Sequence, residues 1–266
     1  MAASGQSRRR VQSIEVGFRV LRVLRMADGL LPLREVAKRA EMPPSKVHLY
    51  LVSFIRENMA YQDAATGSYG LGSFAIQLGL AAVRQADVVG IGSRMLGPLR
   101  DETQCAVYLS LWGDRGPCIV AKADGNLQGA FALRLGYILP VATSATGNVF
   151  LAHLPREDVE RVMEIQDDAS ASGVSRRLPK EELDKIAANV REQGFASTVE
   201  SLNNNFAGLS APIFGPGGDI SAALTLLGSA DYITGERKDA FRDLLLEAAE
   251  TVTDRLAEAK AEPADA

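Results

Sequence analysis

Residues 43–56 carry hydroxyl and cationic side chains at intervals that place them on one side of a helix. Ser45, Lys46, Leu49 and Ser53 fall on the outward side, and apolar residues form the inward side. Serine hydroxyls can bond phosphate or a base, and lysine can contact phosphate or guanine. The segment therefore predicts a helix over 45–57 whose outer side contacts a DNA duplex. The alternative is a structural helical bundle.

The flanking segments predict the frame of a winged helix-turn-helix. Apolar periodicity predicts helices over 13–27 and 33–40, and a Pro-Pro step separates them from the third helix. Two extended runs, 60–63 and 68–71, follow with a turn-rich link between them. In this motif the start of the second helix reaches base edges, and we expect the wing to track phosphates. The residues nominated for DNA contact are Arg8, Arg9, Arg10, Arg34, Pro43, Pro44, Ser45, Lys46, His48, Leu49, Ser53, Arg56, Thr66, Ser68 and Tyr69.

The charge distribution agrees with a polyanion contact near the N-terminus. Residues 1–85 hold 12 Lys and Arg against 6 Asp and Glu, a net charge of +6. Residues 86–266 hold 17 against 27, a net charge of −10. A small basic module on a larger acidic one suggests DNA or RNA as the partner. A basic surface without a partner is the alternative.

The first predicted helix is apolar over a wider arc than one core contact needs. Apolar residues surround all but one strip, which holds Glu15, Arg19 and Arg22. A surface helix normally needs an apolar stripe of about 100°. The excess predicts packing on a second subunit, or cover by a later segment of the same chain.

The rest of the chain predicts a mixed domain with a largely antiparallel sheet. Helix and strand patterns do not alternate strictly, which favours an α+β fold. The predicted helices cover 71–83, 88–102, 144–153, 157–164, 180–193 and 234–259. The predicted strands cover 106–111, 118–122, 130–135, 196–199, 206–214 and 220–227, and the sequence GPGGD at 215–219 predicts a hairpin turn.

The sequence lacks the residue sets that common enzymes and metal sites need. It contains no GxSxG, P-loop or HExxH motif, and its two cysteines and two histidines lack metal-ligand spacing. We expect no catalytic residue, no metal and no cofactor. No apolar run reaches about 18 residues, and the Arg-rich start lacks a secretory core, so we expect a cytoplasmic protein with no membrane partner. A protein-binding module and an enzyme acting on a small molecule stay open as alternatives.

Several motifs together resemble one known family, the IclR family of bacterial transcriptional regulators. They are SIEVGFRVL (13–21), LREVA (33–37), SKVHLYL (45–51), GSYGLG (67–72), SATG (144–147), REQGFA (191–196) and GLSAPIF (208–214). They occur in order, and the resemblance covers about residues 11 to 258. It implies a GAF-like effector domain, control of a catabolic operon, and assembly as a homodimer or a dimer of dimers. The implied division is a basic disordered arm (1–12), a winged helix-turn-helix DNA-binding domain (13–70), a linker helix (71–85), a GAF-like effector-binding and oligomerisation domain (86–260) and a tail (261–266).

The resemblance also implies an effector pocket at the start of helix 144–153 and along the strands 206–214 and 220–227. Backbone N–H groups at a helix N-terminus can hold a carboxylate. The residues nominated by position are Ala145, Thr146, Gly147, Thr198, Gly208, Ser210, Thr225 and Leu227.

Two departures from the family pattern bear on function. Leu49 stands where the family usually has Arg, so a thymine methyl contact can replace a phosphate or guanine contact. In family members that bind small keto acids, the pocket contains an acid, a thiol and hydroxyls. In this chain the corresponding positions are Thr198, Gly208 and Leu227, and Thr225 keeps one hydroxyl. Our hypothesis is an effector with one carboxylate and an apolar or aromatic body. The sequence does not distinguish a repressor from an activator.

Overall fold

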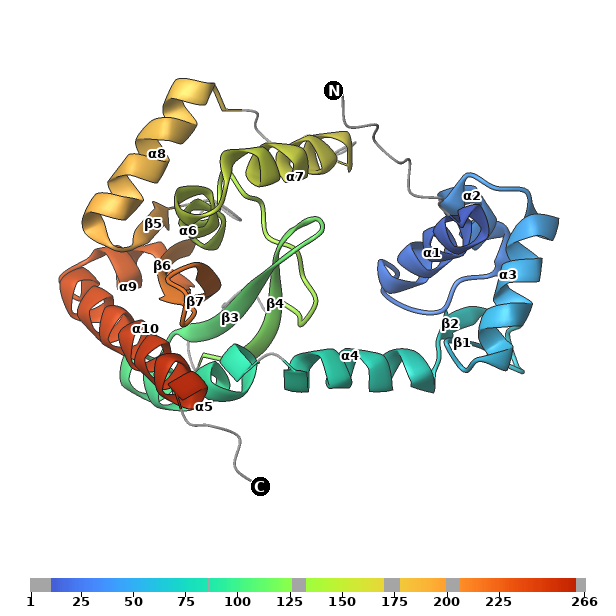
Figure 1. Ribbon diagram of the computed structural model, residues 1–266, viewed down its shortest axis with the longest axis horizontal. Coiled ribbons are helices and arrows are strands. Elements are labelled where there is room, and N and C mark those ends of the chain that lie inside the picture. The colour runs from blue at the N-terminus through green and yellow to red at the C-terminus, as the bar shows by residue number, and fades with distance from the viewer. Residues whose placement is uncertain (1–10, 86, 126–132, 170–177, 200–205, 262–266) are drawn as a thin grey trace, which may run out of the picture. The chain divides into compact units, whose positions relative to one another are not determined.

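The computed structural model describes residues 11–85, 87–125, 133–169, 178–199 and 206–261 (Figure 1). The division between its two compact units falls between Ala82 and Val83. Most of the predicted N-terminal arm and the tail lie outside the described residues.

The N-terminal unit is three helices followed by a two-stranded hairpin and the start of a fourth helix. The elements are α1 (Gln12–Arg25), α2 (Leu33–Ala40), α3 (Pro44–Arg56), β1 (Ala60–Gln62), β2 (Tyr69–Leu71) and α4 (Ser73–Gln85). Each of the first three helices turns an apolar stripe inward, and Val20, Val36, Val47 and Leu51 are fully buried. β1 and β2 pair antiparallel. Helix, helix, turn, helix and hairpin follow in the order predicted for a winged helix-turn-helix.

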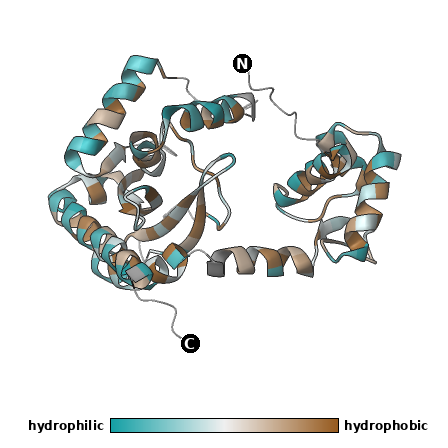
Figure 2. Ribbon diagram, in the orientation of Figure 1, coloured by the Kyte–Doolittle hydropathy of each residue, from teal (hydrophilic) through white to brown (hydrophobic). Residues whose placement is uncertain are grey.

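Apolar side chains of α1 and α4 remain uncovered. Ile14 and Phe18 of α1 are more than half exposed. On α4, the exposed large apolar side chains are Phe74, Ile76, Leu78 and Leu80. Figure 2 shows apolar residues along most of α4. Within the described part of the N-terminal unit, no later segment covers Ile14 or Phe18.

The C-terminal unit is a five-stranded antiparallel sheet with helices on both faces. Its elements are α5 (Asp87–Thr103), β3 (Ala106–Gly113), β4 (Gly116–Ala123), α6 (Ala145–His153), α7 (Arg156–Ala169), α8 (Lys180–Gln193), β5 (Ala196–Val199), β6 (Phe206–Phe214), β7 (Ile220–Ser229), α9 (Ala230–Thr234) and α10 (Lys238–Ala261). The strand order is β4-β3-β7-β6-β5. Every neighbouring pair is antiparallel, as the sequence predicts.

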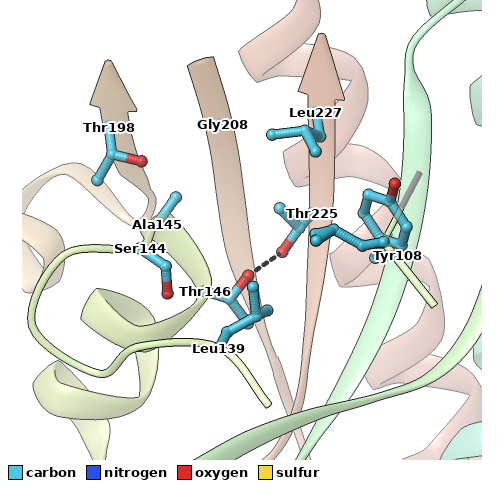
Figure 3. Close-up of a pocket in the computed structure, with 10 residues that line it drawn as sticks. Tyr108, Leu139, Ser144, Ala145, Thr146, Thr198, Gly208, Thr225 and Leu227 are labelled. Carbon is cyan, nitrogen blue, oxygen red and sulfur yellow. Dashed lines mark hydrogen bonds between the residues drawn. The ribbon is translucent and has the colours of Figure 1, made fainter. Parts of the chain in front are cut away.

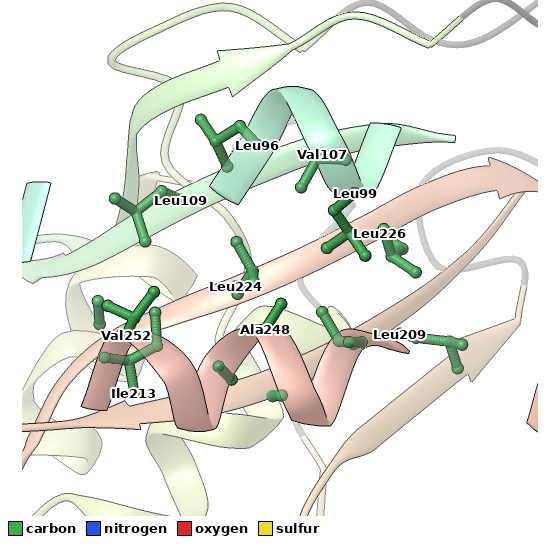
Figure 4. Packing of buried hydrophobic residues seen from close by; sticks show 14 of the residues in the cluster. Leu96, Leu99, Val107, Leu109, Leu209, Ile213, Leu224, Leu226, Ala248 and Val252 are labelled. Atoms are coloured by element: carbon green, nitrogen blue, oxygen red, sulfur yellow. The ribbon is translucent and has the colours of Figure 1, made fainter. Parts of the chain in front are cut away.

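The alternation of side chains along the strands creates two cores. Leu109, Leu209 and Leu224 project from one face and pack with α5 and α10 (Figure 4). The opposite face packs with α6, α7 and α8, whose buried residues include Phe150 and Val159. The sheet is therefore the middle layer of the unit, and α6 lies on the face that carries the functional residues described below.

Three predicted elements differ from the structure. Residues 133–135 of the predicted strand 130–135 are not a strand, because the chain turns at Gly136, which has a φ of +78°; the rest of that strand lies largely outside the described residues. α7 continues beyond 164 to Ala169. The predicted closing helix 234–259 begins later, at Lys238, because the short α9 ends at Thr234 and Gly235 follows it with an extended backbone.

No single helix in the described part of the chain is long and apolar enough to cross a membrane. Only Ser73–Ala82 and Asp87–Thr103 taken together have the length and composition of a span.

Candidate functional site

The turn between α2 and α3 sets the direction of the third helix. Glu41 caps α2 in the left-handed conformation at φ 52°, and the Met42 amide donates to the Ala37 carbonyl over 3.0 Å. Pro43 precedes α3 in an extended conformation, and Pro44 occupies its first turn, where the missing N–H has no helical acceptor to lose. This turn leaves the start of α3 exposed; that it contacts bases stays a prediction.

The outward side of α3 is open to solvent. Leu49, at its centre, is 69% exposed. Ser53 donates its hydroxyl proton to the Leu49 carbonyl over 3.1 Å, so in this rotamer its oxygen can still accept a hydrogen bond, but its proton is engaged. Arg34, at the start of α2, is also exposed. The other exposed residues nominated on α3 are Ser45, Lys46, His48 and Arg56.

The wing is closed by a carboxylate. Asp63 accepts from the Thr66 amide over 2.8 Å and from the Thr66 hydroxyl over 2.7 Å, and these hydrogen bonds lower the pKa of Asp63. Gly67 follows at φ +68°, a conformation that a residue with a side chain rarely adopts. Thr66 is exposed and Ser68 half-buried, so both remain within the proposed contact set.

Tyr69 corrects the predicted DNA contacts. Its side chain is 3% exposed and packs in the core of the N-terminal unit. Its backbone is also occupied, because its amide donates to the Leu31 carbonyl and its carbonyl accepts from the Leu31 amide. Tyr69 therefore anchors the hairpin and is removed from the set that can reach a phosphate. Arg8, Arg9 and Arg10 lie outside the described residues.

The strand register gathers the nominated pocket residues on one face of the C-terminal sheet. Thr225 of β7 is opposite Ser210 of β6 and Tyr108 of β3. In the next row, Leu227 is opposite Gly208, which is opposite Thr198 of β5. Directly opposed residues project to the same side of a sheet. These two rows lie beneath the amino end of α6 (Figure 3).

Hydroxyl groups link the sheet to α6. The Thr225 hydroxyl is 2.8 Å from the Thr146 hydroxyl and 2.9 Å from that of Ser210. All three side chains are buried. Because the surroundings are otherwise apolar, this chain of hydrogen bonds satisfies groups that would be costly to bury alone, and it holds the first turn of α6 over β7.

The amino end of α6 is only partly capped. Ser144 accepts from the Gly147 amide over 2.9 Å and donates to the Pro140 carbonyl over 2.6 Å. Within the described chain, the amides of Ala145 and Thr146 have no hydrogen-bond partner. Free amides at a helix N-terminus, together with the helix dipole, favour an anion.

A cavity of about 20 Å³ lies between α6 and the two rows. This volume is enough for about one water-sized molecule. The residues that line it are Tyr108, Leu133, Leu139, Ser144, Ala145, Thr146, Thr198, Gly208, Thr225 and Leu227. None of these side chains is charged at neutral pH, and burial raises the pKa of Tyr108 to about 12. The cavity therefore offers a helix N-terminus, hydroxyls and apolar walls.

One wall of the cavity is tied to α7 by a single side chain. The Gln166 amide nitrogen donates to the Leu139 carbonyl over 3.0 Å and to the Arg115 carbonyl over 2.8 Å. Its oxygen accepts from the Val141 amide over 3.0 Å. These three hydrogen bonds fix segment 139–141, which carries Leu139 into the cavity wall.

Comparison with known proteins finds a matching family domain for the N-terminal unit and another for the C-terminal unit. Residues 13–64 match the IclR helix-turn-helix domain, and residues 80–254 match the bacterial transcriptional regulator IclR C-terminal domain. The chain belongs to the IclR family. The family consists of transcription regulators and not of enzymes. The predicted α+β fold, a helix-turn-helix followed by a GAF-like effector domain, is confirmed.

Individual IclR-family relatives cover almost the whole chain. The transcriptional repressor IclR of Escherichia coli is 25% identical over 256 residues, which are 94% of this chain and 90% of the relative. The crystal structure of Pseudomonas aeruginosa HmgR is 30% identical, with a TM-score of 0.58, and covers 93% of this chain and 98% of that one. An IclR homologue from Microbacterium hydrocarbonoxydans, solved with 4-hydroxybenzoate, shares the fold at 18% identity, with a TM-score of 0.76 over 94% of this chain and 99% of that one.

The structure brings six of the eight nominated effector residues of this IclR-family chain to the cavity: Ala145, Thr146, Thr198, Gly208, Thr225 and Leu227. Their binding role stays a prediction. Ser210 does not line the cavity. Its hydroxyl instead forms a hydrogen bond with the hydroxyl of Thr225. Gly147 does not line the cavity either, and its amide is used by Ser144, so it is not a free anion donor as predicted.

Sequence reasoning missed four lining residues of the IclR-family cavity: Tyr108, Leu133, Leu139 and Ser144. Ser144 had a recognisable signal, since a serine before a helix is a frequent N-cap. Tyr108 had only its alternation along β3, which does not reveal the strand beside it. The Leu133 and Leu139 contacts depend on how the segment before α6 folds back, and no local pattern predicts that path.

Proposed function

We propose that this IclR-family regulator controls a catabolic operon in response to a small metabolite with one carboxylate and an apolar or aromatic body. The observation that carries the proposal is the cavity, where the unpartnered amides of Ala145 and Thr146 occur among uncharged side chains. Carboxylates bind readily at helix N-termini. The apolar walls formed by Leu133, Leu139 and Leu227 suit a hydrocarbon body.

A fold relative supports an aromatic acid as the class of effector. The homologue from Microbacterium hydrocarbonoxydans was solved with 4-hydroxybenzoate. In this chain, Gly208 leaves space beside Ala145, whose Cβ would lie 3.4 Å from a Cβ added at Gly208. Because the present cavity admits about one water-sized molecule, binding requires Leu133 or Leu139 to move. We propose that this movement passes to the DNA-binding unit and changes the spacing of two α3 helices.

The DNA contacts follow from the exposed face of α3, the start of α2 and the wing. We propose contacts from Arg34, Pro43, Pro44, Ser45, Lys46, His48, Leu49, Ser53, Arg56, Thr66 and Ser68, with Arg8, Arg9 and Arg10 as a basic arm. Two copies of α3 must enter successive major grooves about 34 Å apart, or a multiple of it. Operator binding therefore requires a homodimer or a dimer of dimers.

The uncovered apolar faces support self-association. Ile14 and Phe18 on α1, and Ile76 and Leu80 on α4, are exposed. A symmetric dimer brings the same patch of each copy together, which would remove these side chains from water. We propose that these faces form the dimer contact of the DNA-binding unit.

One binding experiment tests the proposed effector control. The full-length protein is titrated onto the DNA upstream of its own coding sequence, with benzoate, 4-hydroxybenzoate or pyruvate added in turn. We expect the aromatic acids to change DNA affinity or operator geometry, and pyruvate to do neither. A response to pyruvate alone would overturn the proposed effector class. A complex whose affinity does not change with salt concentration would overturn the phosphate contacts.

A further inference from the structure

A buried hydroxyl in the cavity has no hydrogen-bond partner. Tyr108 is 1% exposed and lines the cavity, and its phenol oxygen bonds to no residue that the structure describes. The neighbouring hydroxyls of Ser210 and Thr225, in the same row of the sheet, are paired. A buried polar group without a partner costs about 1–3 kcal/mol. Phenylalanine would fill this position without that cost, so the hydroxyl indicates a partner beyond the described residues, such as a molecule bound in the cavity.

The surroundings of Tyr108 leave its hydroxyl available. Its ring packs with Ile119, Leu133, Leu139 and Leu227, whose side chains cannot accept a hydrogen bond. Burial raises the pKa of Tyr108 to about 12. The Leu133 backbone amide lies near the phenol and acts to lower this pKa, but it does not meet the geometry of a hydrogen bond. The phenol therefore stays protonated and can both donate and accept.

The other buried polar side-chain atoms without a hydrogen-bond partner lie away from the cavity. In the described chain, the Ser110 hydroxyl and the His153 Nε2 also lack partners, but neither residue lines the cavity. Among the side chains that the structure describes, Tyr108 alone combines a buried, unpartnered polar atom with a place in the cavity wall.

The register places Tyr108 one strand from the anion-binding end of the cavity. Tyr108 is opposite Thr225, and Thr225 is bonded to Thr146 in the first turn of α6. Neighbouring strands are about 4.8 Å apart. Figure 3 shows Tyr108 beside Thr225 and Leu227, across the cavity from Thr198 and Ala145. A molecule whose carboxylate meets the α6 amides can therefore extend its other end to Tyr108.

We propose that Tyr108 is a specificity-determining residue, whose hydroxyl bonds a hydroxyl or carbonyl group that the effector carries on the side of its apolar body away from the carboxylate. This inference rests on the proposed function and narrows it to hydroxy- or oxo-substituted aromatic acids. An unsubstituted acid of the same size leaves the Tyr108 hydroxyl without a hydrogen-bond partner.

Calorimetric titration of the full-length protein with matched acids tests the inference. The probes are 4-hydroxybenzoate and 4-methylbenzoate, which differ by a hydroxyl against a methyl group of similar size. We expect the wild-type protein to favour the hydroxy acid at least tenfold, and Tyr108→Phe to reduce this preference to within about threefold. Tyr137→Phe is the matched control, because Tyr137 is exposed and does not line the cavity; it retains the wild-type preference.

A stability measurement separates a binding role from a structural one. Because the hydroxyl has no partner in the described chain, unliganded Tyr108→Phe should unfold at the same or higher urea concentration than wild type. Lower stability, or an undiminished preference for 4-hydroxybenzoate in Tyr108→Phe, would overturn the role of Tyr108 while leaving the aromatic-acid effector in place. If wild type binds neither acid, the proposed effector class fails and the inference fails with it.

Discussion

Leu49 places a branched apolar side chain in the middle of the α3 surface that we propose to face DNA, among hydroxyl, imidazole and cationic groups. Nothing in the described chain covers it, since it is 69% exposed. The C5 methyl of thymine is the apolar group that the major groove offers. The outward position of Leu49 on α3 could be predicted from the sequence, because the type of a side chain and the helical periodicity are both local properties.

We predict that single replacements of thymine by uracil within the operator weaken binding at the positions that Leu49 contacts. Each lost methyl contact should lower affinity about fourfold, since burying one such group is worth about 0.8 kcal/mol. Fluorescence anisotropy on a duplex selected by the protein from a random pool would measure this. Leu49→Ala should lose the sensitivity, and Val52→Ala should keep it. Wild-type affinity that is unaffected by uracil at every position would contradict the contact.

Gly147 illustrates a residue whose role the sequence misassigned. A Cβ at this position would be 2.3 Å from both the Pro140 and the Val141 carbonyl oxygens. The glycine is thus required for the close approach of α6 to the chain before it, and not for anion binding.

We predict that Gly147→Ala lowers the free energy of unfolding of the C-terminal unit by about 1–3 kcal/mol, the usual cost of forcing an atom into a packed site. The fluorescence of Trp112, the single tryptophan, can follow this unfolding in urea. Gly208→Ala is the control, because its nearest new contact is 3.4 Å away, and its stability should stay near wild type. Equal stability of the two variants would rule out the packing explanation.

At the scale of elements, periodicity predicted nearly every helix and strand, because burial of one face is encoded in consecutive residues. β5 and β6 have the predicted bounds, 196–199 and 206–214. What could not be predicted is the pairing of Tyr108 with Thr225, which are far apart in the chain. The position of α7 against segment 139–141 could not be predicted either, because Gln166 holds this segment through hydrogen bonds to backbone groups, which carry no sequence signal.

We predict that Gln166→Leu loosens the cavity wall. The change leaves the Leu139 and Arg115 carbonyls and the Val141 amide without the partner that now holds them, which should lower the free energy of unfolding by about 1–2 kcal/mol. Hydrogen exchange of the Val141 amide should also become faster. Gln193→Leu, at an exposed position on α8, should change neither quantity. Unchanged exchange at Val141 in Gln166→Leu would show that this side chain does not hold the segment.

At the scale of the whole molecule, the sequence predicted two units and their family, which the comparisons confirm. It also indicated an apolar surplus on α1, and the structure adds a second one on α4. The state of assembly depends on contacts with other copies, which a single chain does not contain.

We predict that the double variant Ile76→Lys with Leu80→Lys dissociates into monomers. These residues are one turn apart on α4, and in a symmetric dimer each change occurs twice. Losing four buried side chains at about 1.5 kcal/mol each should weaken association about 10⁴-fold. Sedimentation of the full-length protein would measure this, with Gln77→Lys on the same helix as control. A variant that remains dimeric would place the interface elsewhere.

The small size of the cavity has a kinetic consequence. We propose that an effector as large as an aromatic acid enters only after the side chains around the cavity rearrange. In rapid-mixing experiments the observed association rate should therefore level off as the acid concentration rises, because a first-order opening step becomes limiting. The rate at which the regulator responds to a sudden change in metabolite concentration would then be limited by the rate constant of cavity opening.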